Sequence, residues 1–131
     1  MNTTVLIIAH APLASAYCDV ASHVLSGQHK QLFCLDIEAD ADVEQAVTAG
    51  IEMLQPTAGG QGALVLTDCF GATPSNIAGR IAESNTQNRL ITGINLPMLI
   101  RVLNYQQENA KALASIAVEG GKTAIIEPQA N

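Results

Sequence analysis

His10 and Asp68 are the residues whose types and positions point most directly to chemistry. His10 closes the apolar run Val5–Ala9, and Asp68 closely follows the run Ala63–Leu66. Such runs predict buried strands, and the carboxyl ends of neighbouring parallel strands meet at one edge, where ligands bind. A carboxylate that accepts from one imidazole nitrogen fixes the tautomer and leaves the other nitrogen free to attack phosphorus. The pair therefore predicts phosphoryl handling through His10, with Asp68 orienting the imidazole.

The segment after Asp68 predicts an anion-binding loop. Gly71 permits a tight turn, and Thr73-Pro74 is the expected start of a helix, a hydroxyl cap followed by a fixed φ. The free N–H groups of a helix start attract anions, so Thr73 has two compatible roles, as a cap and as a donor to a phosphoryl oxygen. The residues that we expect to bind the phosphoryl group are Phe70, Gly71, Ala72 and Thr73, with Asn76 in support.

The other reactive side chains predict no metal or redox site. Cys18, Cys34 and Cys69 lack CxxC spacing, which is typical of two core thiols and one loop thiol in a reducing compartment. The histidines do not fall at metal-ligand spacings with these cysteines, and we expect His23 and His29 at the surface. The chain is therefore expected to need no metal and no cofactor.

The composition favours one layered α/β domain over residues 1–131. Hydrophobic residues make up 48% of the chain and charged residues 14%, so most strands should be buried on both faces. The apolar runs are too short to span a membrane, and the N-terminus lacks the basic region of a signal peptide, which favours a cytoplasmic protein. A net charge of −6, with six scattered Lys and Arg, argues against nucleic-acid binding.

The order of the expected elements predicts the topology. Hydrophobic spacing and breakers predict strands over 3–9, 31–37, 63–66 and 89–94, and helices over 13–25, 38–54, 73–84, from 97 onwards and 108–118. A flexible surface loop is expected over 56–62. Gly120-Gly121 is expected to stop the last helix before a short strand over 123–126. The pattern predicts a doubly wound, mostly parallel sheet of order 2-1-3-4. The last strand would pair antiparallel at an edge or be exchanged between protomers.

Three motifs resemble the mannose-class IIA domains of the bacterial phosphoenolpyruvate-dependent sugar phosphotransferase system. They are LIIAH ending in His10, LTDCFGATPSNIA (66–78) and GINLPML (93–99). The resemblance implies that His10 accepts a phosphoryl group from the phosphocarrier protein HPr and passes it to a IIB partner. It further implies that Asp68 hydrogen-bonds the second ring nitrogen, that the loop to Thr73 cradles the phosphoryl group, and that a homodimer exchanges its C-terminal strands.

The chain departs from many such domains at Ala11-Pro12, where a Gly or Ser often follows the histidine, and at Cys69-Phe70, where some carry Thr-Trp. Neither change touches the expected chemistry, but both bear on the choice of partner. Phe70 fits either a contact with a partner protein or packing within its loop.

No IIB sequence follows, so we expect a stand-alone IIA protein that reaches the membrane only indirectly, through a permease complex. Two other functions stay open. In the first, phosphorylation of His10 switches binding to a regulatory target, with no onward transfer. The second is a flavodoxin-like binder of a phosphate-rich small ligand.

Overall fold

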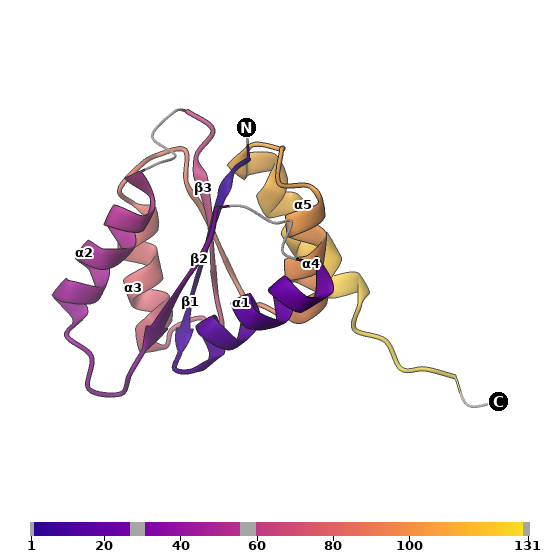
Figure 1. The fold of residues 1–131 in the computed structure, drawn as a ribbon, viewed down its shortest axis with the longest axis horizontal. Helices are drawn as coiled ribbons and strands as arrows, with labels where there is room; N and C mark the ends of the chain where they lie inside the picture. Colours follow the sequence, from indigo (N-terminus) through magenta and orange to yellow (C-terminus); the bar gives the residue numbers. More distant parts are fainter. Residues whose placement is uncertain (1, 27–30, 56–59, 130–131) are drawn as a thin grey trace.

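A parallel sheet of four strands forms the centre of the computed structural model, which describes residues 2–26, 31–55 and 60–129 (Figure 1). The strands are β1 (Thr4–His10), β2 (Leu32–Ile37), β3 (Ala63–Thr67) and β4 (Arg89–Thr92), in the order β2-β1-β3-β4. All three pairings are parallel. This confirms the predicted order and places the end of β1 beside the end of β3.

Helices cover both faces of this sheet, as a doubly wound fold requires. One face carries α2 (Val43–Met53) and α3 (Thr73–Ala82), and the other carries α1 (Leu13–Val24), α4 (Leu96–Asn104) and α5 (Ala110–Thr123) (Figure 1). Each helix begins near the carboxyl edge of the strand before it or continues from a neighbouring helix. The connections therefore bring loops and helix starts to the edge where His10 lies.

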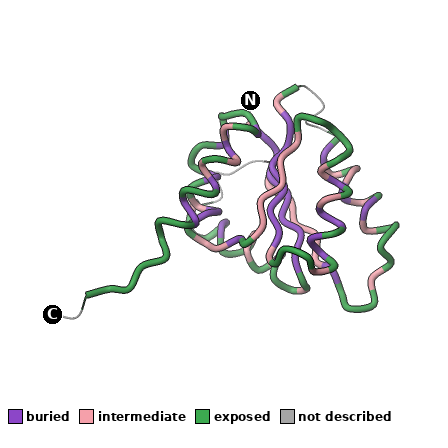
Figure 2. Tube along the Cα trace, turned by 180° about the vertical axis from the view of Figure 1, so that it is seen from behind, coloured by how far each residue is buried: buried purple, intermediate pink, exposed green. Residues whose placement is uncertain are grey.

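Each face of the sheet buries its own apolar cluster. In β1, Val5 and Ile7 pack on the side of α1, α4 and α5, whereas Leu6 and Ile8 pack on the side of α2 and α3. Figure 2 shows the resulting burial along the strands and the inward sides of the helices. Because both faces of the sheet are covered, β1 and β3 are continuous apolar runs, and these runs predict the two strands from the sequence.

Most boundaries differ from the predictions by one or two residues. β4 ends at Thr92 rather than at 94 because Gly93 turns the chain with a φ of +82°, and its N–H donates to the Asp68 carbonyl at 3.0 Å. Asn95 then starts α4 by accepting from the Met98 N–H at 2.9 Å.

The C-terminal part of the chain corrects the prediction. α5 runs through Gly120-Gly121 to Thr123 instead of stopping at the glycines. A Cβ on Gly120 would lie 2.9 Å from the Cβ of Arg101, so this glycine serves the close approach of α5 to α4.

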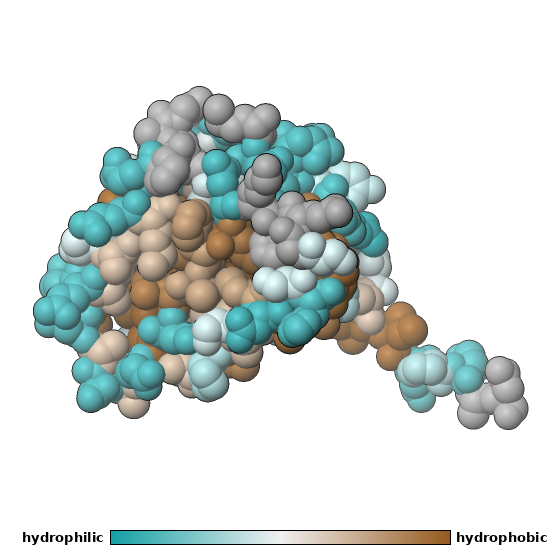
Figure 3. All heavy atoms as spheres, in the orientation of Figure 1, coloured by the Kyte–Doolittle hydropathy of each residue, from teal (hydrophilic) through white to brown (hydrophobic). Residues whose placement is uncertain are grey.

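No strand forms over the predicted 123–126. Residues 125–129 carry no regular structure within the described chain and extend away from the body (Figure 1). A strand needs a neighbour, and this segment pairs with none of the described strands. Ile125 and Ile126 are 78% and 72% exposed, and Figure 3 shows hydrophobic residues at the start of this segment. Exchange with a second protomer stays a prediction.

The remaining side-chain predictions concern the surface and the thiols. His23 is exposed on α1, as expected, whereas His29 and residues 56–59 of the predicted loop lie outside the described residues. Cys18 and Cys34 are half-buried and Cys69 is exposed. Burial, together with the neighbouring Cys34, raises the pKa of the Cys18 thiol to about 12, so this thiol stays protonated. Over the described ranges, no helix has both the length and the apolar character to cross a membrane.

Candidate functional site

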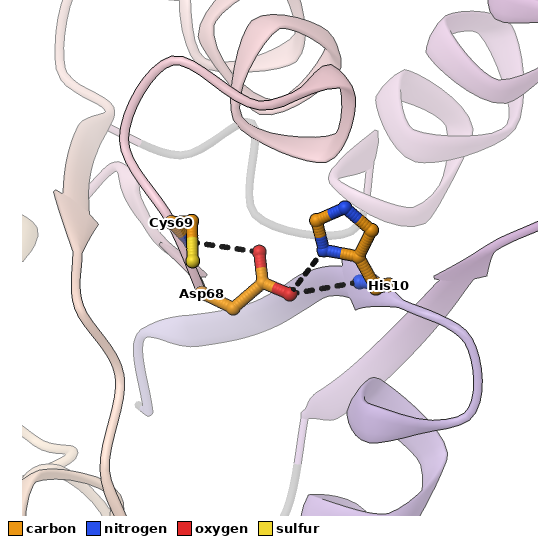
Figure 4. Close-up of polar contacts among 3 residues, drawn as sticks. All are labelled: His10, Asp68 and Cys69. Carbon is orange, nitrogen blue, oxygen red and sulfur yellow. Dashed lines mark hydrogen bonds and ion pairs between the residues drawn. The ribbon is translucent and has the colours of Figure 1, made fainter. Parts of the chain in front are cut away.

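The structure brings His10 and Asp68 together at the carboxyl edge of the sheet (Figure 4). Asp68 Oδ2 lies 2.7 Å from His10 Nδ1 and accepts from the His10 backbone N–H at 3.0 Å. Asp68 Oδ1 accepts from the Cys69 N–H at 2.8 Å. The Asp68 side chain is 10% exposed and the His10 side chain 53%. One ring nitrogen is thus held by the carboxylate, while the imidazole stays open to solvent.

Asp68 is ionised at neutral pH. Its burial alone would raise the pKa, but hydrogen bonds from the His10 backbone, the His10 ring and the Cys69 N–H outweigh burial and lower the pKa. An ionised carboxylate only accepts hydrogen bonds, so the proton between the two side chains resides on Nδ1. The lone pair of Nε2 is then available for chemistry.

The strand register explains why the two side chains meet. The pairing of β1 with β3 ends at Ile8 and Thr67, so His10 and Asp68 both lie just beyond the last paired positions of these two strands. The turn after His10 is fixed by the Ala11 N–H, which donates to the Ile37 carbonyl of β2 at 3.0 Å. The backbone after Asp68 is fixed by the Gly93 N–H described above.

The start of α1 is stabilised by a residue that sequence reasoning missed. Asp36, at the end of β2, accepts from the Ser15 N–H at 3.1 Å and from the Ser15 hydroxyl at 2.6 Å. The carboxylate therefore satisfies an N–H group of the first turn of α1 from another element. Twenty-one positions separate the partners, so no local capping pattern could have revealed the contact.

The start of α3 has no comparable acceptor. α2, α4 and α5 begin with side-chain caps from Asp42, Asn95 and Asn109. In α3 the cap position is Ala72, and no side chain of the described chain accepts from the first turn. Free N–H groups at a helix start attract anions, and this start follows Asp68 by only a few residues.

The prediction that Thr73 caps α3 is wrong. Ala72 has the extended backbone of a cap residue, with φ −78° and ψ 168°, so Thr73 is already the first helical residue. A hydroxyl at this position lies one residue too late to accept from the second and third N–H groups. Thr73 is exposed at the mouth of the helix.

The other predicted residues lie around the loop between Asp68 and α3. Gly71 has a φ of +89°, the conformation for which its glycine was expected. Phe70 is 88% exposed and does not pack into the core. Asn76 is exposed in the first turn of α3, and Ala72 is half-buried. Within the described chain, none of these side chains forms a hydrogen bond with His10 or Asp68.

An apolar groove adjoins the site on the side of α1. It is lined by Leu13, Ala16, Tyr17, Val20 and Leu96. Burial, and then the charge of Asp68, raise the pKa of Tyr17, so the groove lies within the electrostatic reach of the site. Leu13 and Val20, two apolar residues of this groove, are exposed.

Comparisons with known proteins agree with this architecture. A curated relative, the PTS system mannose-specific EIIAB component of Escherichia coli strain K12, is 25% identical over 127 residues. The match covers 95% of this chain but 39% of the relative, so this chain spans well under half of that protein.

Two solved structures show the same fold. The mannose/sorbose specific IIA subunit from Enterococcus faecalis has a TM-score of 0.84 at 23% identity, covering 100% of this chain and 98% of that one. A phosphotransferase system component EIIA from Streptococcus agalactiae has a TM-score of 0.83 at 19% identity, covering 95% and 96%. A family model described as the PTS system fructose IIA component matches residues 4–118. Because that match spans nearly the whole chain, this chain belongs to the EIIA-man family of the phosphotransferase system.

Proposed function

We propose that this protein is a phosphocarrier that accepts a phosphoryl group from phosphorylated HPr on His10 and passes it to a IIB partner. The observation that carries the proposal is the 2.7 Å contact between Asp68 Oδ2 and His10 Nδ1, which leaves Nε2 free. Membership of the EIIA-man family supports a phosphocarrier role. The donor, the acceptor and the residue roles are our inference.

The transfer needs no separate base. Nδ1 keeps its proton on the side of Asp68, and the Nε2 lone pair attacks the phosphorus. The bond between phosphorus and the donor side chain breaks, and its electron pair leaves with the donor. The imidazole becomes cationic on phosphorylation, and the Asp68 carboxylate stabilises that charge. Asp68 therefore both positions the ring and favours the phosphorylated state.

The phosphoryl oxygens are held by backbone dipoles. With a net charge of −6 the chain offers few cations, and the free N–H groups at the start of α3 supply the positive end of a helix dipole. The Thr73 hydroxyl, freed from the capping role, is available to donate to an oxygen. We assign Gly71 and Ala72 to the backbone of this cradle and Asn76 to its support.

The partners dock around His10 through apolar contacts. Phe70 projects from the loop beside Asp68, and the groove of α1 begins three residues after His10. Exposed aromatic and aliphatic side chains of this kind supply much of the energy of protein–protein contacts. We assign Phe70 to the rim of the docking surface rather than to the phosphoryl pocket.

The test is phosphorylation with phosphoenolpyruvate, the general phosphotransferase enzyme and HPr. The parent protein should acquire an acid-labile, base-stable label, and His10→Ala should acquire none. His23→Ala, at an exposed histidine of α1, is the matched control and should label like the parent. A label that survives in His10→Ala would refute the assignment.

Onward transfer separates the carrier from a regulatory switch. Purified phosphorylated protein mixed with candidate IIB domains should lose its label rapidly to a cysteine or histidine of the partner. Persistence of the label with every IIB domain tested would favour the switch, in which phosphorylation of His10 alters binding to a target protein.

A further inference from the structure

Thr67 carries a buried hydroxyl that has no protein partner. The residue is fully buried at the end of β3, directly before Asp68, and its Oγ1 forms no hydrogen bond within the described chain. Buried hydroxyls are almost always paired, because an unpaired one destabilises the folded state. Valine has nearly the same shape and would avoid that loss. An unpaired threonine beside the reactive pair therefore suggests a use in another state of the site.

The hydroxyl lies on the face of the sheet that α3 covers. Ala63 and Val65 of β3 pack in the same cluster as Ile77 and Ala78 of α3. Side chains alternate along a strand, so Thr67 continues the row of Ala63 and Val65 toward α3. Thr67 and α3 thus lie on the same side of the sheet.

His10 lies on this face as well. Leu6 and Ile8 of β1 belong to the same cluster, and His10 follows them by the same alternation. Figure 4 shows the imidazole on the side of the sheet where α3 lies. Thr67 pairs with Ile8, which precedes His10 by two residues and lies on the same face of β1. The Thr67 side chain therefore lies in the next row of the sheet, away from its carboxyl edge.

The first turn of α3 packs on the same side of the sheet with two buried residues. Pro74 and Ser75 are the buried residues of that turn and face the sheet, whereas Thr73 and Asn76 face outward. No side chain accepts from the N–H groups of this turn. The unpaired hydroxyl of Thr67 and the N–H groups of Thr73 and Ser75, which no side chain of the described chain accepts from, therefore lie on the same side of the sheet.

We propose that Thr67 is a positioning residue of the site: through one bound water it donates a hydrogen bond to the phosphoryl oxygen that points inward from His10 toward α3. The water then has three partners, the Thr67 hydroxyl, an N–H of the α3 first turn and the phosphoryl oxygen, which suffices for a buried water. This inference rests on the proposed phosphorylation of His10.

The test compares Thr67→Val with Thr67→Ser and with Thr4→Val. Thr4 is a matched control, because it is also fully buried with an unpaired Oγ1, but it lies at the opposite end of β1 from His10. Each protein is phosphorylated with phosphoramidate, which needs no partner protein. The rate of labelling of His10 and the ³¹P resonance of the phosphohistidine are measured.

We expect Thr67→Val to label up to about tenfold more slowly, the largest factor that the loss of one neutral hydrogen bond, here the one to the bound water, produces. The ³¹P resonance of Thr67→Val should also shift. Thr67→Ser should restore the labelling rate and the resonance, and Thr4→Val should match the parent in both. Urea unfolding should show neither valine variant less stable than the parent, since each removes an unpaired hydroxyl. Equal labelling and resonance in Thr67→Val and Thr4→Val would overturn this inference alone. Absence of a label on His10 in the parent would overturn the proposed function and the inference with it.

Discussion

At the scale of single residues, the proposed phosphorylation of His10 depends on which ring nitrogen carries the proton. Asp68 settles this because its carboxylate accepts from both the ring and the backbone of His10. The backbone contact holds the carboxylate in place even when the ring rotates. A neutral side chain of the same shape keeps the packing but loses the preference for a protonated Nδ1.

Asp68→Asn should slow phosphorylation of His10 by about a hundredfold. A hydrogen bond to a charged group is worth about 1.5–3 kcal/mol, and the asparagine amide can donate to Nδ1 and so move the ring proton to Nε2. The measurement is the initial rate of labelling from phosphorylated HPr, with far-ultraviolet circular dichroism as the control for folding. A rate within twofold of the parent would contradict the role assigned to Asp68.

The same carboxylate should make stability depend on pH. The pKa of Asp68 is lowered in the folded chain, so its contribution is fully present above the ordinary value of 3.8 and is lost as the pH falls through the lowered pKa. The stability difference between the parent and Asp68→Asn, measured by urea unfolding, should therefore shrink from pH 7 to pH 2. Glu52→Gln, at an exposed carboxylate of α2, is the control. A stability difference between the parent and Asp68→Asn that grows toward acid pH would contradict a lowered pKa of Asp68 in the folded chain.

At the scale of elements, the four strands of the sheet were predictable, whereas the expected strand over 123–126 and several helix ends were not. β1 and β3 follow from their apolar runs because both faces of the sheet are covered. The placement of His10 and Asp68 followed from those runs. The cap of α1 is supplied across the fold by Asp36, and the cap position of α3 falls on Ala72 rather than on Thr73. Both depend on tertiary geometry that local residue patterns do not encode.

The glycines of α5 show the same limit. Gly120 was expected to stop the helix, because glycine costs about 1 kcal/mol in a helix interior. In the fold this cost is offset by the contact with α4, where Arg101 leaves no room for a side chain. The presence of a second packed helix, rather than the local propensity, decides where α5 ends.

Gly120→Ala should destabilise the protein by about 1 kcal/mol. The new Cβ would meet the Cβ of Arg101 at 2.9 Å, and overpacking of about 1–3 kcal/mol exceeds the gain in helix propensity. Gly79→Ala in α3 is the matched control, because its Cβ would meet nothing within 4 Å, and it should stabilise by up to about 1 kcal/mol. Urea unfolding of both variants measures the difference, and equal effects would contradict the packing argument.

At the scale of the whole molecule, the unpaired edge of β4 lies near the start of the apolar C-terminal segment. Among the residues that the structure describes, β4 pairs with β3 alone, so its other edge is not paired with any of these strands. A pocket beside it is lined by residues of β4, α4 and α5 together with Ile125, where the C-terminal segment begins. Ile125 and Ile126 then project into solvent. Pairing of this segment with β4 of a second protomer would bury both surfaces, in line with the exchange implied by the sequence motifs.

We therefore predict a homodimer that depends on Ile125 and Ile126. Replacing both with Asp should convert the dimer into a monomer, because two carboxylates next to β4 would lose their hydration without gaining a partner. Sedimentation equilibrium of the unmodified chain and of the double variant measures the change. Val24→Asp, which places a charge on an exposed apolar side chain of α1, should leave the dimer intact. A dimer that survives the double substitution would show that the subunits associate through another surface, and a parent chain that sediments as a monomer would contradict the exchange itself.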